Sequence, residues 1–211
     1  MRKIFIFIIC IICFAGQVNA FTINSYERGS VSNGSTVNPD WSLELQSVGL
    51  SPDLTVENFD DQVYNSDIEL YDAEDNVWTA INSYNGWCVS GVGLYSYSYS
   101  SNSEYPNNLG INFLNGITEF AIHTGALDNP LDIYINGQYE GQVLGHAAGR
   151  DYNLLITVTA GAGEVINNME LMGSNDGFLY DNLSYGGNAV PEPANIIFLG
   201  LAVLFLLKLK K

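Results

Sequence analysis

Short runs of alternating apolar and polar residues recur through the middle of the chain, with turn residues between them. The clearest is Leu131–Ile135, followed by Asn136–Gly137 and Gln138–Val143. Alternation with a period of two predicts strands with one buried face. Asn-Gly favours a type I′ turn because both central residues need positive φ. This segment therefore predicts a β-hairpin.

Similar runs extend over much of the chain, and none shows a long helical period. They lie at 41–46, 67–71, 77–81, 87–89, 109–113, 117–122, 154–158, 165–166, 169–171, 178–180 and 182–185. Asn85–Gly86 and Asn115–Gly116 predict two further tight turns. About ten short strands at this spacing predict an all-β fold: an antiparallel two-sheet β-sandwich of the jelly-roll type.

The N-terminus has the order of a secretory signal peptide over residues 1–20. A short basic start precedes the apolar run 4–14, and Val18 and Ala20 occupy the cleavage-site positions. The run is shorter than the roughly 20 residues that a spanning helix needs, so an uncleaved anchor is the less favoured alternative. The mature chain is expected to begin near Phe21.

The C-terminus carries a second short apolar run, at 194–207, between Pro-Glu-Pro and lysines. As a helix it would be about 21 Å long, against a hydrocarbon core of about 30 Å. The terminal lysines would hold its end on the cytoplasmic side. A simple tail anchor is the alternative, but it does not explain Pro-Glu-Pro. We expect a short transmembrane helix that is held in the membrane while the chain is processed.

Pro-Glu-Pro, an apolar helix and a basic tip at 190–211 resemble the PEP-CTERM sorting signal of Gram-negative bacteria. The family often ends in arginines, whereas this chain ends in lysines. The resemblance implies export by the general secretion machinery, an inner-membrane intermediate, and recognition by an exosortase, a transpeptidase-like membrane enzyme. It also implies a final place at the cell surface or in an extracellular matrix with exopolysaccharide. The signal residues are Val190, Pro191, Glu192, Pro193, Lys208, Lys210 and Lys211.

The body between these ends, residues 21–189, is long enough for one domain and strongly acidic. It keeps two of the seven basic residues, Arg28 and Arg150, and 22 of the 23 acidic ones, which leaves a formal charge of −20. Nucleic acid is excluded as a partner because its binding needs a basic surface. Calcium, neutral sugars and basic partners are all compatible with this charge.

The body also resembles the passenger domains of PEP-CTERM proteins. Residues 58–185 open with Asn-Phe-Asp-Asp and close with Tyr-Asp-Asn-Leu and a short strand. Such domains are similar to galactose-binding and other carbohydrate-binding jelly rolls. The resemblance therefore implies the fold more than any particular ligand.

Asp60, Asp61 and Asp181 are candidate calcium ligands. The opening and closing strands of a jelly roll often lie side by side, which would bring these carboxylates together. Calcium takes six to eight oxygen ligands, and related sugar-binding jelly rolls often hold one here. The alternative is that all three are solvated turn and strand-edge residues. The hypothesis is thus one structural calcium ion.

Tyr95, Tyr97 and Tyr99 alternate with serines and are candidate glycan-binding residues, with Trp87 beside them. In a strand the three tyrosines share one face, and exposed rings would form a stacking platform for sugars. The same alternation equally fits tyrosines in the core with serines in water, which is the more frequent case.

No motif of an enzyme is present. Neither His123 nor His146 has a metal-ligand spacing around it, and Cys88 has no defined base near it. We therefore expect a non-catalytic surface or matrix protein. The alternative is a secreted glycan-active hydrolase that uses a pair of the many carboxylates.

Overall fold

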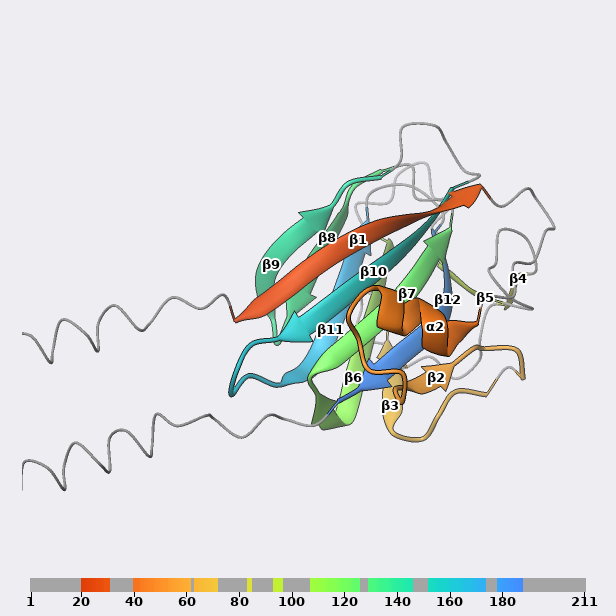
Figure 1. The fold of residues 1–211 in the computed structure, drawn as a ribbon. Coiled ribbons are helices and arrows are strands. Elements are labelled where there is room, and N and C mark those ends of the chain that lie inside the picture. The colour runs from red at the N-terminus through yellow and green to blue at the C-terminus, as the bar shows by residue number, and fades with distance from the viewer. Residues whose placement is uncertain are drawn as a thin grey trace, which may run out of the picture.

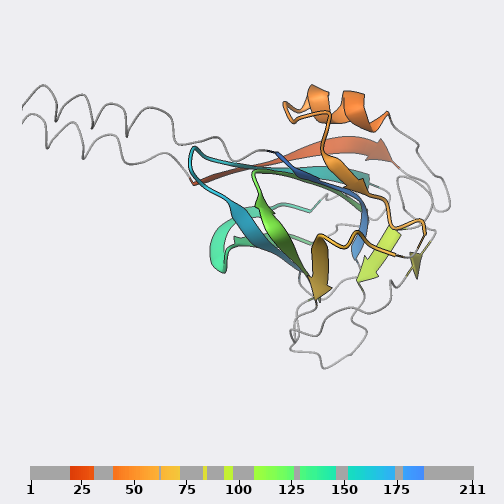
Figure 2. The same cartoon turned by 90° about the horizontal axis from the view of Figure 1, so that it is seen from below.

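The folded body consists of two antiparallel β-sheets packed face to face (Figure 1). The structure is a computed structural model, and it describes residues 20–30, 40–61, 63–71, 83–84, 93–96, 107–125, 129–145, 152–173 and 178–187. These residues confirm the predicted all-β sandwich. They add one helix, α2 (Trp41–Ser47), on the outer side of the larger sheet (Figure 2).

Strands that follow one another in the chain often lie in different sheets. The larger sheet has the order β1-β10-β7-β12-β5-β4, with β2 also paired to β12, and the smaller has the order β3-β6-β11-β8-β9. The larger sheet contains β1 (Phe21–Ser30), β2 (Thr55–Glu57), β4 (Ser83–Tyr84), β5 (Gly93–Ser96), β7 (Glu119–Gly125), β10 (Tyr152–Ala160) and β12 (Phe178–Gly186). The smaller sheet contains β3 (Ile68–Tyr71), β6 (Asn107–Ile117), β8 (Leu131–Ile135), β9 (Gln138–Val143) and β11 (Ile166–Gly173).

The core fills the space between the sheets with the apolar half of each alternating strand. On β8, Leu131, Ile133 and Ile135 are buried, whereas Asp132 and Tyr134 are partly exposed. Burying each such aliphatic side chain contributes about 1.5–3 kcal/mol. The core residues of both sheets form one cluster, and the principal members are Phe59, Leu70, Leu109, Ile111, Phe120, Ile122, Ile156, Val158, Leu171 and Tyr180.

The hairpin between β8 and β9 forms as its sequence predicts. Asn136 has φ 51° and Gly137 has φ 76°, as a type I′ turn requires. The Asn136 side chain also donates to the carbonyl of Val165 at 2.8 Å and accepts from the N–H of Asn167 at 2.8 Å. One turn residue thus ties the hairpin to the start of β11.

The prediction of a strand at 41–46 is wrong, because this segment forms α2. Asp40 caps its N-terminus, where Oδ1 accepts from the Leu43 N–H at 3.2 Å, and Gly49 with φ 82° follows its end. The apolar residues of this stretch also fit helical spacing. Packing of Leu45 against the larger sheet selects the helix over the strand.

The predicted turn at Asn115–Gly116 is also wrong. Both residues lie within β6, in an irregular stretch between the cross-strand pairs Asn112–Asn168 and Ile117–Ile166. The positive φ of Gly116, 59°, bends the strand instead of reversing it. The chain then crosses to the other sheet, so β6 and β7 do not form a hairpin.

The strand that begins the body, β1, has no counterpart among the predicted strands. It pairs with β10 from Phe21–Ala160 to Ser30–Tyr152. Its apolar–polar alternation is short and is interrupted at Asn24–Ser25, so the sequence pattern does not predict a strand here. This strand forms one edge of the larger sheet.

Both ends of the described body lie at the same end of the sandwich. Ala20 accepts from the N–H of Gly161 at 2.7 Å, and Thr118 accepts from Ala160 at 2.8 Å. Thr118 in turn donates to Gly186 at 2.8 Å. These bonds connect the start of β1, through β10 and the start of β7, with the end of β12 (Figures 1 and 2).

Candidate functional site

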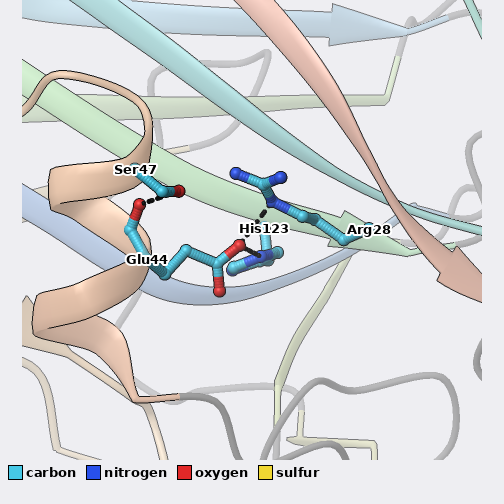
Figure 3. A network of polar contacts seen from close by, with 4 residues as sticks. All are labelled: Arg28, Glu44, Ser47 and His123. Atoms are coloured by element: carbon cyan, nitrogen blue, oxygen red, sulfur yellow. Dashed lines mark hydrogen bonds and ion pairs between the residues drawn. The ribbon is translucent and has the colours of Figure 1, made fainter.

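A polar network lies between α2 and the outer face of the larger sheet (Figure 3). Glu44 comes from the first turn of α2, Arg28 from β1 and His123 from β7. In the sheet, His123 stands directly opposite Leu155 of β10 on one side and Asp181 of β12 on the other. The polar network therefore joins α2 to β1 and β7.

One carboxylate oxygen of Glu44 contacts both Arg28 and His123. Oε1 of Glu44 forms an ion pair with Nε of Arg28 and lies 3.6 Å from Nε2 of His123 (Figure 3). The ring of Trp41 meets the His123 ring edge to face, with centroids 4.5 Å apart. Cζ of Arg28 lies 5.3 Å from the centre of the Tyr26 ring, within cation–π distance.

Burial governs the charge states of this network. Burial lowers the pKa of His123 below its ordinary value and outweighs the opposing effect of Glu44. Burial alone would raise the pKa of Glu44, but His123 and Arg28 together hold it below its ordinary value. At neutral pH the stable arrangement is a charged Glu44–Arg28 pair beside a neutral imidazole.

The three residue types of a serine-hydrolase triad, His, Asp and Ser, also lie on this face of the sheet. They do not form the hydrogen-bonded catalytic triad. His123, Asp181 and Ser184 are each no more than 2% exposed. In the described part of the chain, Nδ1 of His123 and Oγ of Ser184 have no hydrogen-bond partner. A nucleophile must be hydrogen-bonded to its base, and the base to an orienting group. What the geometry supports is a clasp that holds the helix on the sheet.

Apolar packing completes the clasp beside the polar network. Leu45 of α2 and Leu50 and Leu54 after it pack against Ala121 and Leu155 of the sheet. The hydroxyl of Ser47 donates to the carbonyl of Glu44 at 2.7 Å in the last turn of the helix (Figure 3). The helix is thus secured by an apolar cluster and by one shared carboxylate.

Sequence reasoning missed Arg28 and Glu44 as partners of His123. A signal was present in the composition: Arg28 is one of two cations in a body of charge −20, so a carboxylate partner was to be expected. Which of the many carboxylates pairs with it depends on α2, and that segment was predicted as a strand.

A second buried carboxylate organises the loop after β2. Glu57 is 4% exposed, and its two oxygens accept from the N–H groups of Phe59 and Asn65, each at 2.8 Å. Burial raises the pKa of Glu57, helped by Asp61 and Asp67 and opposed by these two bonds. Phe59 is fully buried at φ 59°, a strained conformation for a bulky residue, and the Glu57 carboxylate holds it.

The candidate calcium residues take different positions around this loop. Asp60 and Asp61 are exposed; the Asp60 carboxylate accepts from Nδ2 of Asn58 at 3.3 Å and that of Asp61 from the N–H of Val63 at 2.9 Å. Asp181 is buried on β12 opposite His123. The opening and closing segments do lie side by side, since β2 pairs with β12. Among the described residues no group of three His, Cys, Asp or Glu side chains comes together as a metal site. The calcium ion remains a prediction, and melting with calcium and with chelator tests it.

The remaining predicted residues fall largely outside the described ranges. Tyr95 lies in β5, where its backbone pairs with Leu179 of β12. Ala20 is partly exposed at the start of β1. Outside the described residues lie Trp87, Tyr97, Tyr99, Val18 and the sorting-signal residues of 190–211.

Within the described parts of the chain, no helix has the length and hydropathy needed to cross a membrane. Comparison with known protein families, with curated proteins and with solved structures finds no match. The functional argument therefore rests on the residues and geometry of this chain.

Proposed function

We propose that the chain is an exported surface or extracellular-matrix protein of a Gram-negative bacterium, with a non-catalytic β-sandwich body that binds matrix polysaccharide. Residues 1–20 act as the signal peptide, and residues 190–211 as a sorting signal cut by an exosortase-type enzyme. The observation that carries the proposal is the position of the two ends of the body. Phe21, the expected first residue of the mature chain, pairs with Ala160, and Ala160 is connected through Thr118 to Gly186 by two hydrogen bonds at one end of the sandwich. Before the two terminal segments are cut, they would hold a body of this geometry from one end, with its sheets and its opposite end directed away from the membrane.

The finer architecture belongs to the same proposal. Segments next to each other in sequence, such as β6 and β7 or β10 and β11, lie in different sheets. Crossings between the two sheets occur in Greek-key sandwiches, of which jelly rolls and galactose-binding-like domains are examples. We place this body in that architectural group.

Export and processing can be followed with an antiserum raised against the body, which needs no tag. The full chain is compared in its host with a chain that ends at residue 189 and with Glu192→Gln. We expect the full chain on the cell surface without its tail, as shown by mass spectrometry of the C-terminal peptide. The chain without the tail should be in the medium or periplasm, and the Glu192→Gln chain should accumulate in the inner membrane.

Two results would contradict the proposal. One is a surface protein that still carries residues 194–211. The other is a full chain that stays in the cytoplasm.

A further inference from the structure

A row of side chains crosses the whole outer face of the smaller sheet. Tyr71 of β3 stands opposite Gly110 of β6, and Gly110 opposite Glu170 of β11. Glu170 stands opposite Tyr134 of β8, and Tyr134 opposite Tyr139 of β9. Residues directly opposite in neighbouring strands share a face and lie about 4.5–5.5 Å apart at Cβ. Five strands thus contribute to one continuous line with three tyrosines and a carboxylate.

Contacts within the row hold these side chains in place. The Tyr71 ring lies over Gly110, where an added Cβ would be 2.2 Å from the ring, and its hydroxyl donates to Oε1 of Glu170 at 3.2 Å. The rings of Tyr134 and Tyr139 meet edge to face at 5.5 Å. Tyr139 is 57% exposed, and Tyr134 and Glu170 are partly exposed, whereas Tyr71 is buried and supports Glu170 from one side. Rings held before a ligand arrives lose little entropy on binding.

The charge of this sheet has a single sign. Its described strands contain Glu69, Asp132, Glu140 and Glu170 and no lysine, arginine or histidine. Neutral amides bind two of these carboxylates: Asn112 donates to Glu69 at 3.1 Å and Gln142 to Asp132 at 2.7 Å. These hydrogen bonds orient the carboxylates without cancelling their charge. None of the four forms an ion pair with a described residue.

We infer that this face binds a polysaccharide that carries protonated amino groups. Charge complementarity selects such a ligand, because carboxylates attract ammonium groups and repel acidic polysaccharides. Tyr134 and Tyr139 serve the same ligand, since their faces accept the C–H side of a sugar ring and attract a nearby ammonium group. The inference rests on the proposed function, in which the body meets matrix polysaccharide, and names the ligand chemistry and the site.

Tyr134 marks the centre of this site. Glu170 stands across from it on β11, and Asp132 lies two residues before it on the same face of β8. Gln142 stands opposite Asp132 and extends the polar surface onto β9. A sugar ring over this tyrosine would have carboxylates on two sides.

The test uses the full chain in mild detergent and isothermal titration with four probes. These are a glucosamine oligomer, the fully N-acetylated oligomer of equal length, an oligomer of galacturonic acid, and a lysine peptide of equal charge. We expect the glucosamine oligomer to bind tightest and the acetylated oligomer about tenfold more weakly, a difference near 1.4 kcal/mol. The acidic oligomer should not bind.

Two variants and their matched controls locate the site. Tyr139→Ala and Glu170→Gln should each weaken binding of the glucosamine oligomer by about tenfold or more. Tyr139→Phe keeps the ring and should bind as the parent does. Glu164→Gln removes one exposed charge in the turn after β10 and should have little effect. Thermal melting of each variant verifies that it is folded.

The outcomes separate this inference from the proposed function. If the lysine peptide binds as tightly as the glucosamine oligomer and Tyr139→Ala changes nothing, charge alone explains the binding and the inference is wrong. If no sugar probe binds while the protein reaches the surface, the inference fails and export stands. If the row binds the glucosamine oligomer but the chain stays in the cytoplasm, the proposed function fails.

Discussion

The outer faces of the two sheets are used differently. On the larger sheet, α2 packs on an apolar cluster and contacts the buried His123 through Trp41 and Glu44. On the smaller sheet no described helix lies over the outer face (Figure 2). Tyr139 is exposed there. Both faces carry polar and aromatic side chains, so residue type does not distinguish them. The packing of one short helix makes the first face a structural interface, whereas among the described residues of the second face Tyr139 stays exposed.

The largest expected effect comes from weakening the packing of α2 on the larger sheet. Leu45→Ala deletes the buried contact of α2, and we expect it to lower the free energy of unfolding by about 2–5 kcal/mol. Urea denaturation measures the change. Leu43→Ala, on the same helix but 62% exposed, should stay within about 0.5 kcal/mol of the parent. A loss in Leu45→Ala no larger than that in Leu43→Ala would show that Leu45 does not pack on the sheet, because Ala is the better helix former at both positions.

A smaller effect is expected on the other face from Gly110→Ala. The new methyl group would meet the Tyr71 ring, so the ring must move off the strand, at a cost of about 1–3 kcal/mol. Urea denaturation of the single and double variants gives the coupling. In a Tyr71→Ala background most of this cost should vanish. The same cost in both backgrounds would mean that Tyr71 does not lie over Gly110.

The pH dependence of stability tests the clasp. Because burial lowers the pKa of His123, the unfolded chain binds its proton first as the pH falls below about 6.5, and the folded state loses stability. Glu44 and Arg28 face this imidazole, and Asp181 stands opposite it on β12. His123→Asn should remove this contribution, which is at most about 1.4 kcal/mol per pH unit.

The measurement is urea unfolding of both proteins between about pH 7 and about pH 5. Glu57 contributes with the opposite sign, because its raised pKa makes stability fall as the pH rises above its unfolded value. Glu57 and His146 are common to both proteins, so the difference in slope reports His123. Identical slopes would show that this imidazole is not buried.

The smallest effect on stability is expected at the exposed end of the tyrosine row. Tyr139→Ala should cost less than about 1 kcal/mol, because more than half of the side chain is already in water and only the contact with Tyr134 is lost. Thermal melting provides the comparison. A loss as large as that of Leu45→Ala would show that this face is structural like the other.

Local chemistry made part of the fold predictable. Asn136–Gly137 encodes its own turn, because few other pairs adopt positive φ twice at low cost. The alternation at Leu131–Ile135 likewise predicts which side chains enter the core. The same reasoning failed at Asn115–Gly116, where pairing with β11 keeps the residues within a strand. It also failed at 41–46, where the sheet stabilises a helix that the short pattern alone leaves ambiguous.

The sites depend on pairings that the sequence does not contain. Glu44 and His123 are far apart along the chain, and the row from Tyr71 to Tyr139 runs across all five strands of the smaller sheet. The tyrosines predicted as a platform were the conspicuous ones at 95–99, whereas the described row draws single tyrosines from separate strands. A sequence pattern shows neighbours on one strand but not those across the sheet.

What the sequence determined by itself is the class of the molecule: many short alternating segments, acidic throughout, between two ends that resemble export and sorting signals. Period-two burial and turn chemistry are local properties, so they can be read without a structure. Only the tertiary structure decided which strands pair, which face α2 covers, and which carboxylate meets Arg28. Those results depend on long-range packing, where the free energy of burying one face against another outweighs the weak preferences of any short segment.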